Sequence, residues 1–459
     1  MTFAFYDLET TGLSAAFDQP LQFAAILTDD EFKEIERVNL RCRVAPHIIP
    51  SPWALAVTGV RPAQLLDPAL PNLFEFTQEI AALIERWSPA TWTGFNSIRF
   101  DEEMLRQAFY QNLQPDIFAT QFNGNTRFDI LTALYGVWYR QPDLIDWHVD
   151  ETGRVRFKLD LIAPLNGFAA HNAHDALGDV EATIHIAQKI AQRAPALWAE
   201  LLSNREKARV QARLEAFQPM ALVERFGGGA PRATIGCFCG YSTINPNQAA
   251  FFDLEAADPA ELQHADDATM FAAVDATPKL IRSLAVNKSP ALLPVSRPSA
   301  VQAQRAKVIA NAPAFRARVA QALAKRFPED PAAPVPLVEK QIFGGFYSNA
   351  DKSLLSEFQR ADWRRRQEIV AELSDARLRQ LGRRLVAFHA PELLTPEERD
   401  QFQAWLQTRW RAADAPETEW MTAEKARLAL DELRAVDGRE PALIAEIEGY
   451  LQDFDIPTA

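Results

Sequence analysis

The sequence predicts an α/β domain, followed by a small β-barrel domain and an all-α C-terminal domain. Three observations predict this order. Strand-like and helix-like patterns alternate over the first ~190 residues, short apolar runs separated by glycine follow, and helical periodicity dominates from about residue 346. We place the domains at residues 1–194, 195–339 and 340–459. A chain of 459 residues is too long for one ordinary core, which agrees with several domains.

The first domain opens with an apolar strand and then alternates. We expect strands at 3–9, 22–28, 41–44 and 91–96, helices at 73–87, 102–112 and 180–191, and a further helix beginning near 127. The helix at 73–87 has a clear signal, because Phe76, Ile80 and Leu83 recur at a spacing of three or four residues.

The remainder changes pattern twice. Runs at 226–229, 235–240, 250–254 and 284–290 predict the strands of the barrel, and 300–327 predicts helix again. The proline-rich segment 327–336 predicts a linker. The helical C-terminal part holds an arginine-rich stretch from Arg360 to Arg384, for which a solvated helix face is the alternative to a binding surface.

Composition describes a globular chain without a membrane partner. Hydrophobic residues make up 48% and charged residues 24%, and no apolar run reaches the ~18 residues of a membrane span. The N-terminus shows no signal segment, and three cysteines (Cys42, Cys237 and Cys239) cannot form a disulfide framework. We therefore expect a cytoplasmic protein. Its net charge of −13 argues against coating nucleic acid by bulk electrostatics.

Two carboxylates stand at the end of the first predicted strand. Side chains alternate between the faces of a strand, so Asp7 and Glu9 point the same way. Carboxylates in this position repel each other unless a cation lies between them. A solvated edge strand with two unremarkable acids is the alternative, since an Asp-x-Glu pattern is common.

Three further residues of the same domain complete a candidate site. Asp101 lies where a strand meets a helix, His174 lies on the loop before the last helix of the domain, and Asp179 lies in the first turns of that helix. Taken singly, Asp101 could be a helix N-cap and His174 a structural histidine. Asp129, at the start of another helix, has the same N-cap alternative.

Together these residues supply what metal-assisted phosphodiester hydrolysis needs. Two divalent cations ~3.5–4 Å apart can activate a water molecule and stabilise the leaving oxygen. Such a centre requires hard carboxylate oxygens, which suit Mg²⁺, and Mn²⁺ can substitute. It also requires a base for the attacking water, and histidine has a suitable pKa near neutral pH.

Three motifs resemble the DEDD exonuclease superfamily in its histidine subclass: Asp7-x-Glu9, Asn96-x-x-x-Phe100-Asp101, and His174 five residues before Asp179. Further blocks resemble bacterial exonuclease I and span most of the chain. They lie at 22–26, 57–60, 94–96, 99–103, 172–176, 287–290 and 345–351.

The resemblance implies a ribonuclease H-like exonuclease domain, an SH3-like barrel and a helical C-terminal domain that together clamp single-stranded DNA. It implies that Asp7, Glu9, Asp101 and Asp179 bind two Mg²⁺ ions and that His174 is the general base. The implied activity is processive 3′→5′ degradation of single-stranded DNA to 5′-mononucleotides, in DNA repair and recombination. The implied partner is the C-terminal tail of single-strand-binding protein, for which the stretch from Arg360 to Arg384 is our candidate. We expect a monomer.

Substrate contacts are expected close to the metal ligands. Thr10, Thr11 and Leu13 would hold the terminal nucleotide beside Glu9, with Leu13 as a wedge between bases. Phe23 and Phe100 could stack on bases, although a core position is at least as good an interpretation for each. The remaining substrate-binding residues that we predict, mostly through phosphate contacts, are Arg99, Arg127, Lys158, Asn287 and Lys288.

Some residues depart from the family pattern. Leu27 stands where a basic residue is usual, Lys158 stands where an arginine is common, and the segment 385–391 lacks the usual Asn-Phe-Pro turn. An exoribonuclease, a proofreading subunit and a non-catalytic binding protein are the rival functions. The ~270 residues after the first domain argue against the first two, and the five filled site positions argue against the third.

Overall fold

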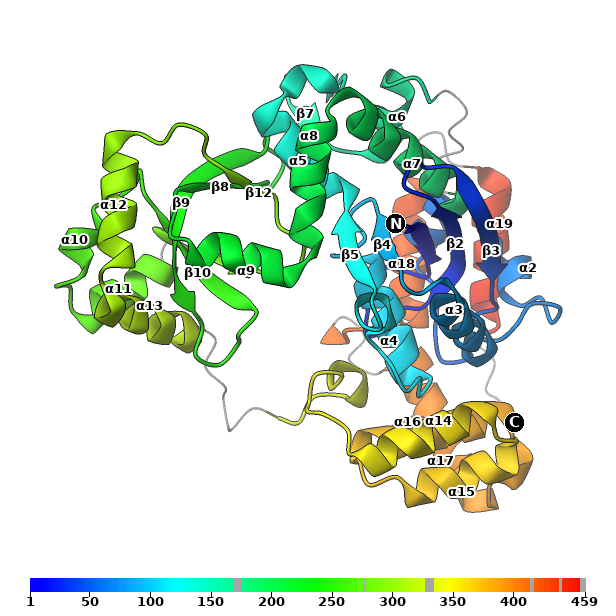
Figure 1. The fold of residues 1–459 in the computed structure, drawn as a ribbon. Coiled ribbons are helices and arrows are strands. Elements are labelled where there is room, and N and C mark those ends of the chain that lie inside the picture. The colour runs from blue at the N-terminus through cyan, green and yellow to red at the C-terminus, as the bar shows by residue number, and fades with distance from the viewer. Residues whose placement is uncertain (169–174, 276, 327–333, 413–416, 437–439, 455–459) are drawn as a thin grey trace.

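The structure of the protein, a computed structural model, describes residues 1–168, 175–275, 277–326, 334–412, 417–436 and 440–454 (Figure 1). Two predictions therefore fall outside the described residues: most of the linker at 327–336, and His174 of the candidate site.

A five-stranded mixed sheet forms the centre of the first part of the chain, in the order β3-β2-β1-β4-β5. The strands are β1 (Phe3–Thr10), β2 (Pro20–Thr28), β3 (Glu34–Arg41), β4 (Thr91–Gly94) and β5 (Thr126–Asp129). β1, β2 and β3 pair antiparallel, whereas β4 runs parallel to β1 and β5 parallel to β4. A separate two-stranded hairpin is made by β6 (His148–Val149) and β7 (Val155–Arg156).

Helices cover both faces of this sheet (Figure 1). The helices of this part of the chain are α1 (Pro52–Thr58), α2 (Pro62–Leu65), α3 (Leu73–Trp87), α4 (Asp101–Gln111), α5 (Ile130–Arg140), α6 (Leu159–Leu165), α7 (Ala176–Arg193) and α8 (Pro195–Leu202). The predicted bounds of α3 are confirmed. Asn72 caps its N-terminus by accepting a hydrogen bond from the Glu75 N–H, and the Glu75 carboxylate accepts one from the Asn72 N–H.

The alternation along β1 sorts its side chains into two cores. Ala4 and Tyr6 pack with residues of α3 and α4, whereas Phe3 and Phe5 pack with residues of α5, α7 and α8. Asp7 follows in register with Phe3 and Phe5. The end of β1 therefore directs its acidic side chains toward the α7 side of the sheet.

The middle of the chain forms a second five-stranded sheet, in the order β11-β10-β9-β8-β12. Its strands are β8 (Met220–Glu224), β9 (Arg232–Tyr241), β10 (Gln248–Asp253), β11 (Ile281–Ala285) and β12 (Leu292–Pro294). The accompanying helices are α9 (Lys207–Glu215), α10 (Pro259–Leu262), α11 (Asp267–Asp275), α12 (Ala300–Ala310) and α13 (Pro313–Lys325). In this order β11 and β12 are the edges, and no pairing among the described residues joins them. The second sheet is confirmed, and its closure into a barrel stays a prediction.

The C-terminal region is helical, as predicted. Its helices are α14 (Asn349–Arg360), α15 (Trp363–Glu372), α16 (Ala376–His389), α17 (Pro396–Trp410), α18 (Ala423–Arg434) and α19 (Pro441–Gln452). One-turn 3₁₀ helices occur along the chain as η1 (Ala119–Gln121), η2 (Pro142–Leu144), η3 (Ser203–Arg205), η4 (Val338–Lys340) and η5 (Pro391–Leu393). α18 and α19 return to the first domain and share a core with α1 and α2.

Some predicted elements are wrong. The third strand was predicted at 41–44 but ends at Arg41, and 226–229 is a turn rather than a strand. The helix expected near 127 begins at Ile130, because 126–129 is strand β5. The helix predicted at 300–327 is broken into α12 and α13, since Pro313 begins a new helix. The boundaries at 194 and 339 stay a prediction.

Among the described residues, no helix has both the length and the apolar character that crossing a membrane requires.

Candidate active site

Strand β1 and helix α7 bring three carboxylates together. Asp7 and Glu9 lie on one face of β1, and Asp179 lies in the first turn of α7, which packs against β1 and β2 (Figure 1). Oxygen atoms of these three side chains lie within 4.8 Å of one another. Two segments separated by ~170 residues thus supply one acidic cluster at the C-terminal end of β1, the middle strand of the sheet.

Asp101 joins the cluster from a third segment. It begins α4, is 3% exposed, and its Oδ1 accepts a 3.0 Å hydrogen bond from the Leu8 N–H. Leu8 lies between Asp7 and Glu9, so this bond ties Asp101 directly to the acidic strand. Of the five residues predicted to carry the chemistry, the structure brings four together, and His174 lies outside the described residues.

Three carboxylates of this cluster, those of Asp7, Glu9 and Asp101, have raised pKa values. Burial, reinforced by the negative charges of Asp179 and Asp101, raises the pKa of Glu9 to about 8. Burial likewise raises the pKa of Asp101 to about 8, and it raises the pKa of Asp7 well above its ordinary value, with Asp101 and Asp179 adding to the effect. Arg41 is the cation that opposes the rise at Glu9.

These residues fit a hard divalent cation. The cluster offers carboxylate oxygens alone, and their mutual repulsion in a buried position is the energetic cost that a bound cation would remove. The ligand roles of Asp7, Glu9, Asp101 and Asp179 stay a prediction.

Asp129 is an acidic residue near the cluster, and a helix N-cap is the structural role that its sequence position offers. That role is confirmed, because its side chain caps α5 by accepting a hydrogen bond from the Thr132 N–H. It also accepts 3.2 Å hydrogen bonds from the N–H groups of Asn96 and Ile98, and its charge helps to raise the pKa of Asp101. The strand-to-helix position of Asp129, which parallels that of Asp101, is the signal that could have placed it near the site.

The loop after β1 has one exposed residue and a buried support. Leu13 is 87% exposed, whereas Thr10 and Thr11 are buried. The Thr11 hydroxyl donates a 2.9 Å hydrogen bond to Asp18, and Asp18 accepts another from the Ser14 N–H. Asp18 therefore braces the loop that presents Leu13, and sequence reasoning missed it because no motif marks it.

Two predicted substrate residues are buried and make contacts within the protein. Phe23 is fully buried and stacks on Tyr6, which favours the core alternative. Arg127 is 6% exposed; its guanidinium pairs with Glu102 at 3.3 Å and donates a 2.9 Å hydrogen bond to the Asn287 carbonyl. Arg127 thus joins the first sheet to the segment after β11.

The other predicted substrate residues are accessible to solvent to different degrees. Arg99, Lys158 and Lys288 are exposed, and Asn287 is half-buried. Lys288 lies near the first domain, with its Nζ 3.4 Å from Glu103. Phe100 is half-buried against the α3–α4 core. Leu27, at a position where a basic residue is usual, is buried in the same core.

Most of the arginine-rich stretch has partners within the protein. Arg365 pairs with Glu357, Glu368 and Glu372. Arg366 lies over the ring of Trp363, and Arg384 pairs with buried Glu339. Arg360, Arg364 and Arg383 are exposed.

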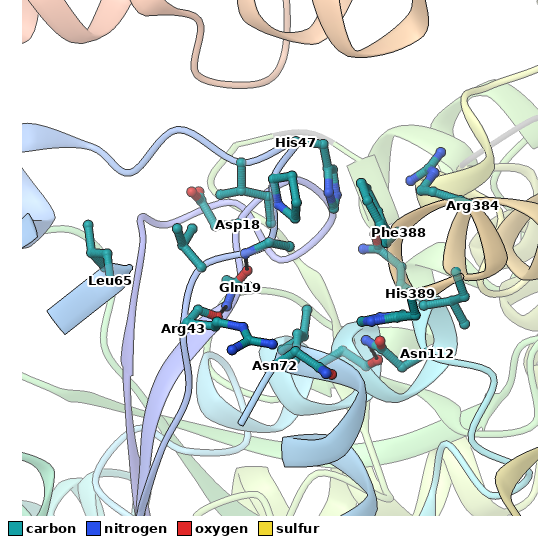
Figure 2. Close-up of a pocket in the computed structure, with 18 of the residues that line it drawn as sticks. Asp18, Gln19, Arg43, His47, Leu65, Asn72, Asn112, Arg384, Phe388 and His389 are labelled. Carbon is teal, nitrogen blue, oxygen red and sulfur yellow. Dashed lines mark hydrogen bonds between the residues drawn. The ribbon is translucent and has the colours of Figure 1, made fainter. Parts of the chain in front are cut away.

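A separate cavity of about 240 Å³ lies between the first domain and α16 (Figure 2). The His47 ring stacks on Phe388 at 5.1 Å on one side, while Arg43, Asn72 and His389 surround the other. The segment 385–391, which departs from the family pattern, contributes to this lining. None of the acidic-cluster residues lines the cavity.

Comparison with known proteins assigns the family. A family model described as Exonuclease matches residues 4–187, and one described as Exonuclease I C-terminal domain matches residues 337–454. Exodeoxyribonuclease I of Escherichia coli (strain K12) is 28% identical over 477 residues, which cover 99% of this chain and 98% of that protein. The chain belongs to the bacterial exonuclease I family.

Other members of the family agree with this assignment. Exodeoxyribonuclease I of Haemophilus influenzae is 29% identical over 89% of this chain and 90% of its own length. The crystal structure of E. coli Exonuclease I in complex with a dT13 oligonucleotide superposes with a TM-score of 0.84 at 26% identity, covering 99% of both chains. Exonuclease I from Methylocaldum szegediense superposes with a TM-score of 0.82 at 25% identity, again over 99% of both chains. The predicted ribonuclease H-like exonuclease domain and helical C-terminal region are confirmed, and exonuclease domains of this superfamily are metal-dependent.

Proposed function

We propose that this protein is a processive 3′→5′ exonuclease that hydrolyses single-stranded DNA to 5′-mononucleotides. The observation that carries the proposal is the near full-length likeness to exodeoxyribonuclease I, together with an acidic cluster inside the exonuclease match. The solved E. coli structures that superpose on this chain contain dA16 and dT13 oligonucleotides. The same likeness supports a role in DNA repair and recombination.

Asp7, Glu9, Asp101 and Asp179 would hold two Mg²⁺ ions, which Mn²⁺ can replace. Bound there, divalent cations supply Lewis-acid polarisation of the scissile phosphate and lower the pKa of the attacking water. The carboxylates would supply the negative charge that balances the cations, and the Leu8 N–H fixes the orientation of Asp101. His174 would accept the proton of the attacking water.

Binding of the 3′ end would fall to the residues around the cluster. Leu13 projects into solvent beside the acidic strand, where its side chain would wedge between the last two bases. The exposed cations Arg99, Lys158 and Lys288 would contact phosphates. Thr10 and Thr11 would act mainly through their main chain, since their side chains are buried.

The proposal also includes a protein partner, the oligomeric state and the closure of the second sheet. A solved structure described as SSB/Exonuclease I, at 25% identity and a TM-score of 0.82, supports single-strand-binding protein as a partner. Exposed Arg360, Arg364 and Arg383 are the arginines of the C-terminal stretch left to receive an acidic tail. We also propose that the chain acts as a monomer, with the domain boundaries given above, and that its second sheet closes as an SH3-like barrel.

A gel time course on single-stranded DNA labelled at its 5′ end tests the activity. One substrate has a free 3′ end and the other a blocked 3′ end, each incubated with Mg²⁺ or with chelator. Stepwise shortening that requires both the free end and Mg²⁺ is the expected result. Asp7→Asn and Asp179→Asn should abolish shortening while DNA binding remains measurable by fluorescence anisotropy.

Three other results of these experiments would contradict the proposal, each in a different way. Shortening of RNA in place of DNA would replace the proposal with an exoribonuclease. Full activity in both aspartate variants would overturn the site assignment. DNA binding without cleavage in any metal condition would leave a binding protein on a nuclease fold.

A further inference from the structure

Asp175 immediately precedes α7, yet its carboxylate does not cap that helix. An aspartate at an N-cap ordinarily accepts hydrogen bonds from the first turn of its own helix. No such side-chain bond forms here. Instead Oδ1 of Asp175 accepts a 2.9 Å hydrogen bond from Nε2 of Gln22 on β2 and pairs with Nη2 of Arg41 on β3 at 3.2 Å. The start of α7 is thus tied to two strands of the first sheet.

Gln22 is held in the orientation that this bond needs. Its side chain is 1% exposed, and Nε2 also donates a 2.8 Å hydrogen bond to Oδ1 of Asn39 on β3. A primary amide nitrogen has two N–H donors, so the donors of Gln22 are both used. Exchanging the amide oxygen and nitrogen would place an oxygen against the Asp175 carboxylate, which is unfavourable.

These contacts of Asp175 connect the two segments that supply the acidic cluster, the end of β1 and the first turn of α7. Gln22 is the direct partner of Glu9 in the ladder between β1 and β2. Asp175 and Asp179 are one helical turn apart, and the Asp179 N–H donates a 3.1 Å hydrogen bond to the Asp175 carbonyl. A restraint on Asp175 therefore acts on the first turn of α7, where Asp179 faces Asp7 and Glu9.

The same contacts also provide partners for the carboxylate of Asp175, a further acid close to the cluster. The charge of Asp175 is close enough to raise the pKa of both Asp7 and Glu9. With Gln22 and Arg41 as its partners, Asp175 is directed toward β2 and β3, so its charge is partly compensated outside the cluster.

We propose that Gln22 and Arg41 are positioning residues that set Asp179 against Asp7 and Glu9 by holding the carboxylate of Asp175. The inference rests on the proposed function of these acids as metal ligands. It assigns to the buried amide of Gln22 a part in assembling the site without any contact with metal or DNA.

A second link between the same elements provides a matched control. Nη1 of Arg37 on β3 pairs with Glu181 on α7 at 2.8 Å, and both side chains are more than one-third exposed. Arg37→Met removes an arginine–carboxylate contact between β3 and α7 but leaves the first turn of α7 tied to Gln22. General docking of α7 and specific placement of Asp179 can therefore be told apart.

Mn²⁺ binding to the metal-free full-length chain, followed by electron paramagnetic resonance, is the first measurement. Gln22→Met and Arg41→Met should each weaken Mn²⁺ binding about tenfold or more, while Arg37→Met should bind as the parent chain does. On single-stranded DNA, the first two variants should lower kcat at limiting Mn²⁺ with KM for DNA within about twofold. High Mn²⁺ should restore their kcat, whereas Asp179→Asn should stay inactive.

The Arg41 side chain is about one-third exposed, so Arg41→Met should fold even if Gln22→Met does not. Parent-like Mn²⁺ binding by Arg41→Met would overturn the proposal. Equal weakening by Arg37→Met would also overturn it, because α7 docking alone would then explain the effect. A parent chain that binds Mn²⁺ but leaves DNA intact would overturn the proposed function and not the positioning role. A parent chain that binds no Mn²⁺ would overturn both.

Discussion

The main-chain N–H of Leu8 donates a 3.0 Å hydrogen bond to Oδ1 of Asp101, which joins the strand of two acids to the helix that carries a third. The bond fixes where the Asp101 carboxylate points, but it offsets only part of the cost of burying that charge, since the pKa of Asp101 remains about 8. Geometry and charge at this position can therefore be separated by substitution.

Asp101→Asn should keep the geometry and lose the function. The amide oxygen can still accept the Leu8 hydrogen bond, but one negative charge leaves a self-repelling cluster. We expect kcat to fall at least about 100-fold, as for removal of a strong electrostatic contributor, while the metal-free protein becomes more stable to urea. Asp101→Ala is the comparison: it leaves the Leu8 N–H unpaired, which costs about 1–3 kcal/mol. Near-parent activity in Asp101→Asn would contradict a ligand role.

The stability of the metal-free protein should fall as pH rises from 6.5 to 8. Glu9 and Asp101 have pKa values of about 8 when folded, well above their ordinary values. Across this window the folded state holds more protons than the unfolded state, so the free energy of unfolding decreases with pH. The buried histidines His47 and His389, whose pKa values are lowered, have the opposite effect, most of which falls below pH 6.5.

Urea unfolding in chelator at several pH values measures this slope. We expect a loss of about 2 kcal/mol or more across the window, since each unit of pKa shift corresponds to about 1.4 kcal/mol. Mg²⁺ at 100 times its Kd should add back about 2.7 kcal/mol at the upper end. Asp101→Asn should flatten the slope in chelator. A stability that rises with pH in chelator would show that the cluster is not protonated as described.

Local periodicity predicted where each acidic residue lies on its own strand or helix, and the resemblance to a known family predicted that these residues lie together. The period of two along β1 placed Asp7 and Glu9 on one face, and the helical pattern beyond residue 179 placed Asp179 near a helix start. The same period also argues against base stacking by Phe23. Phe23 pairs with Leu8, whose side chain packs with the α3–α4 core on the opposite face from the acids.

The sequence could not predict two kinds of feature. One is the contact between residues far apart in the chain, and the other is the boundary of a strand whose residue pattern is weak. The bond between Gln22 and Asp175 spans 153 residues, and no local pattern marks it. Strand β3 is an edge strand with mostly charged or half-exposed residues, so its apolar pattern is faint, and alternation through Cys42 and Val44 continues after the strand has ended. Strand β5 has only 4 residues before α5 begins, which made the two look like one helix.

Glu339 should be a major determinant of stability in the C-terminal region. Its side chain is 3% exposed and pairs with Arg384 at 3.0 Å and Arg409 at 3.6 Å. Glu339→Gln leaves two buried guanidinium groups without a counter-charge, so we expect a loss of about 3–5 kcal/mol in urea unfolding. Glu419→Gln is the control: its partner is half-exposed Lys340, and its loss should be below about 1 kcal/mol. Similar losses in the two variants would contradict the role of burial.

Leu13 should matter for the DNA end and hardly at all for the fold. At 87% exposed it packs against little of the protein, so Leu13→Ala should change the free energy of unfolding by less than about 0.5 kcal/mol. If the side chain wedges between bases, its burial on binding is worth roughly 1.5–3 kcal/mol, and KM for single-stranded DNA should rise about tenfold or more. Ile35→Ala, an exposed apolar residue on edge strand β3, is the matched control and should leave KM unchanged. Equal KM values for Leu13→Ala and the parent chain would place the base contact elsewhere on the loop, because the stability measurement already separates binding from folding.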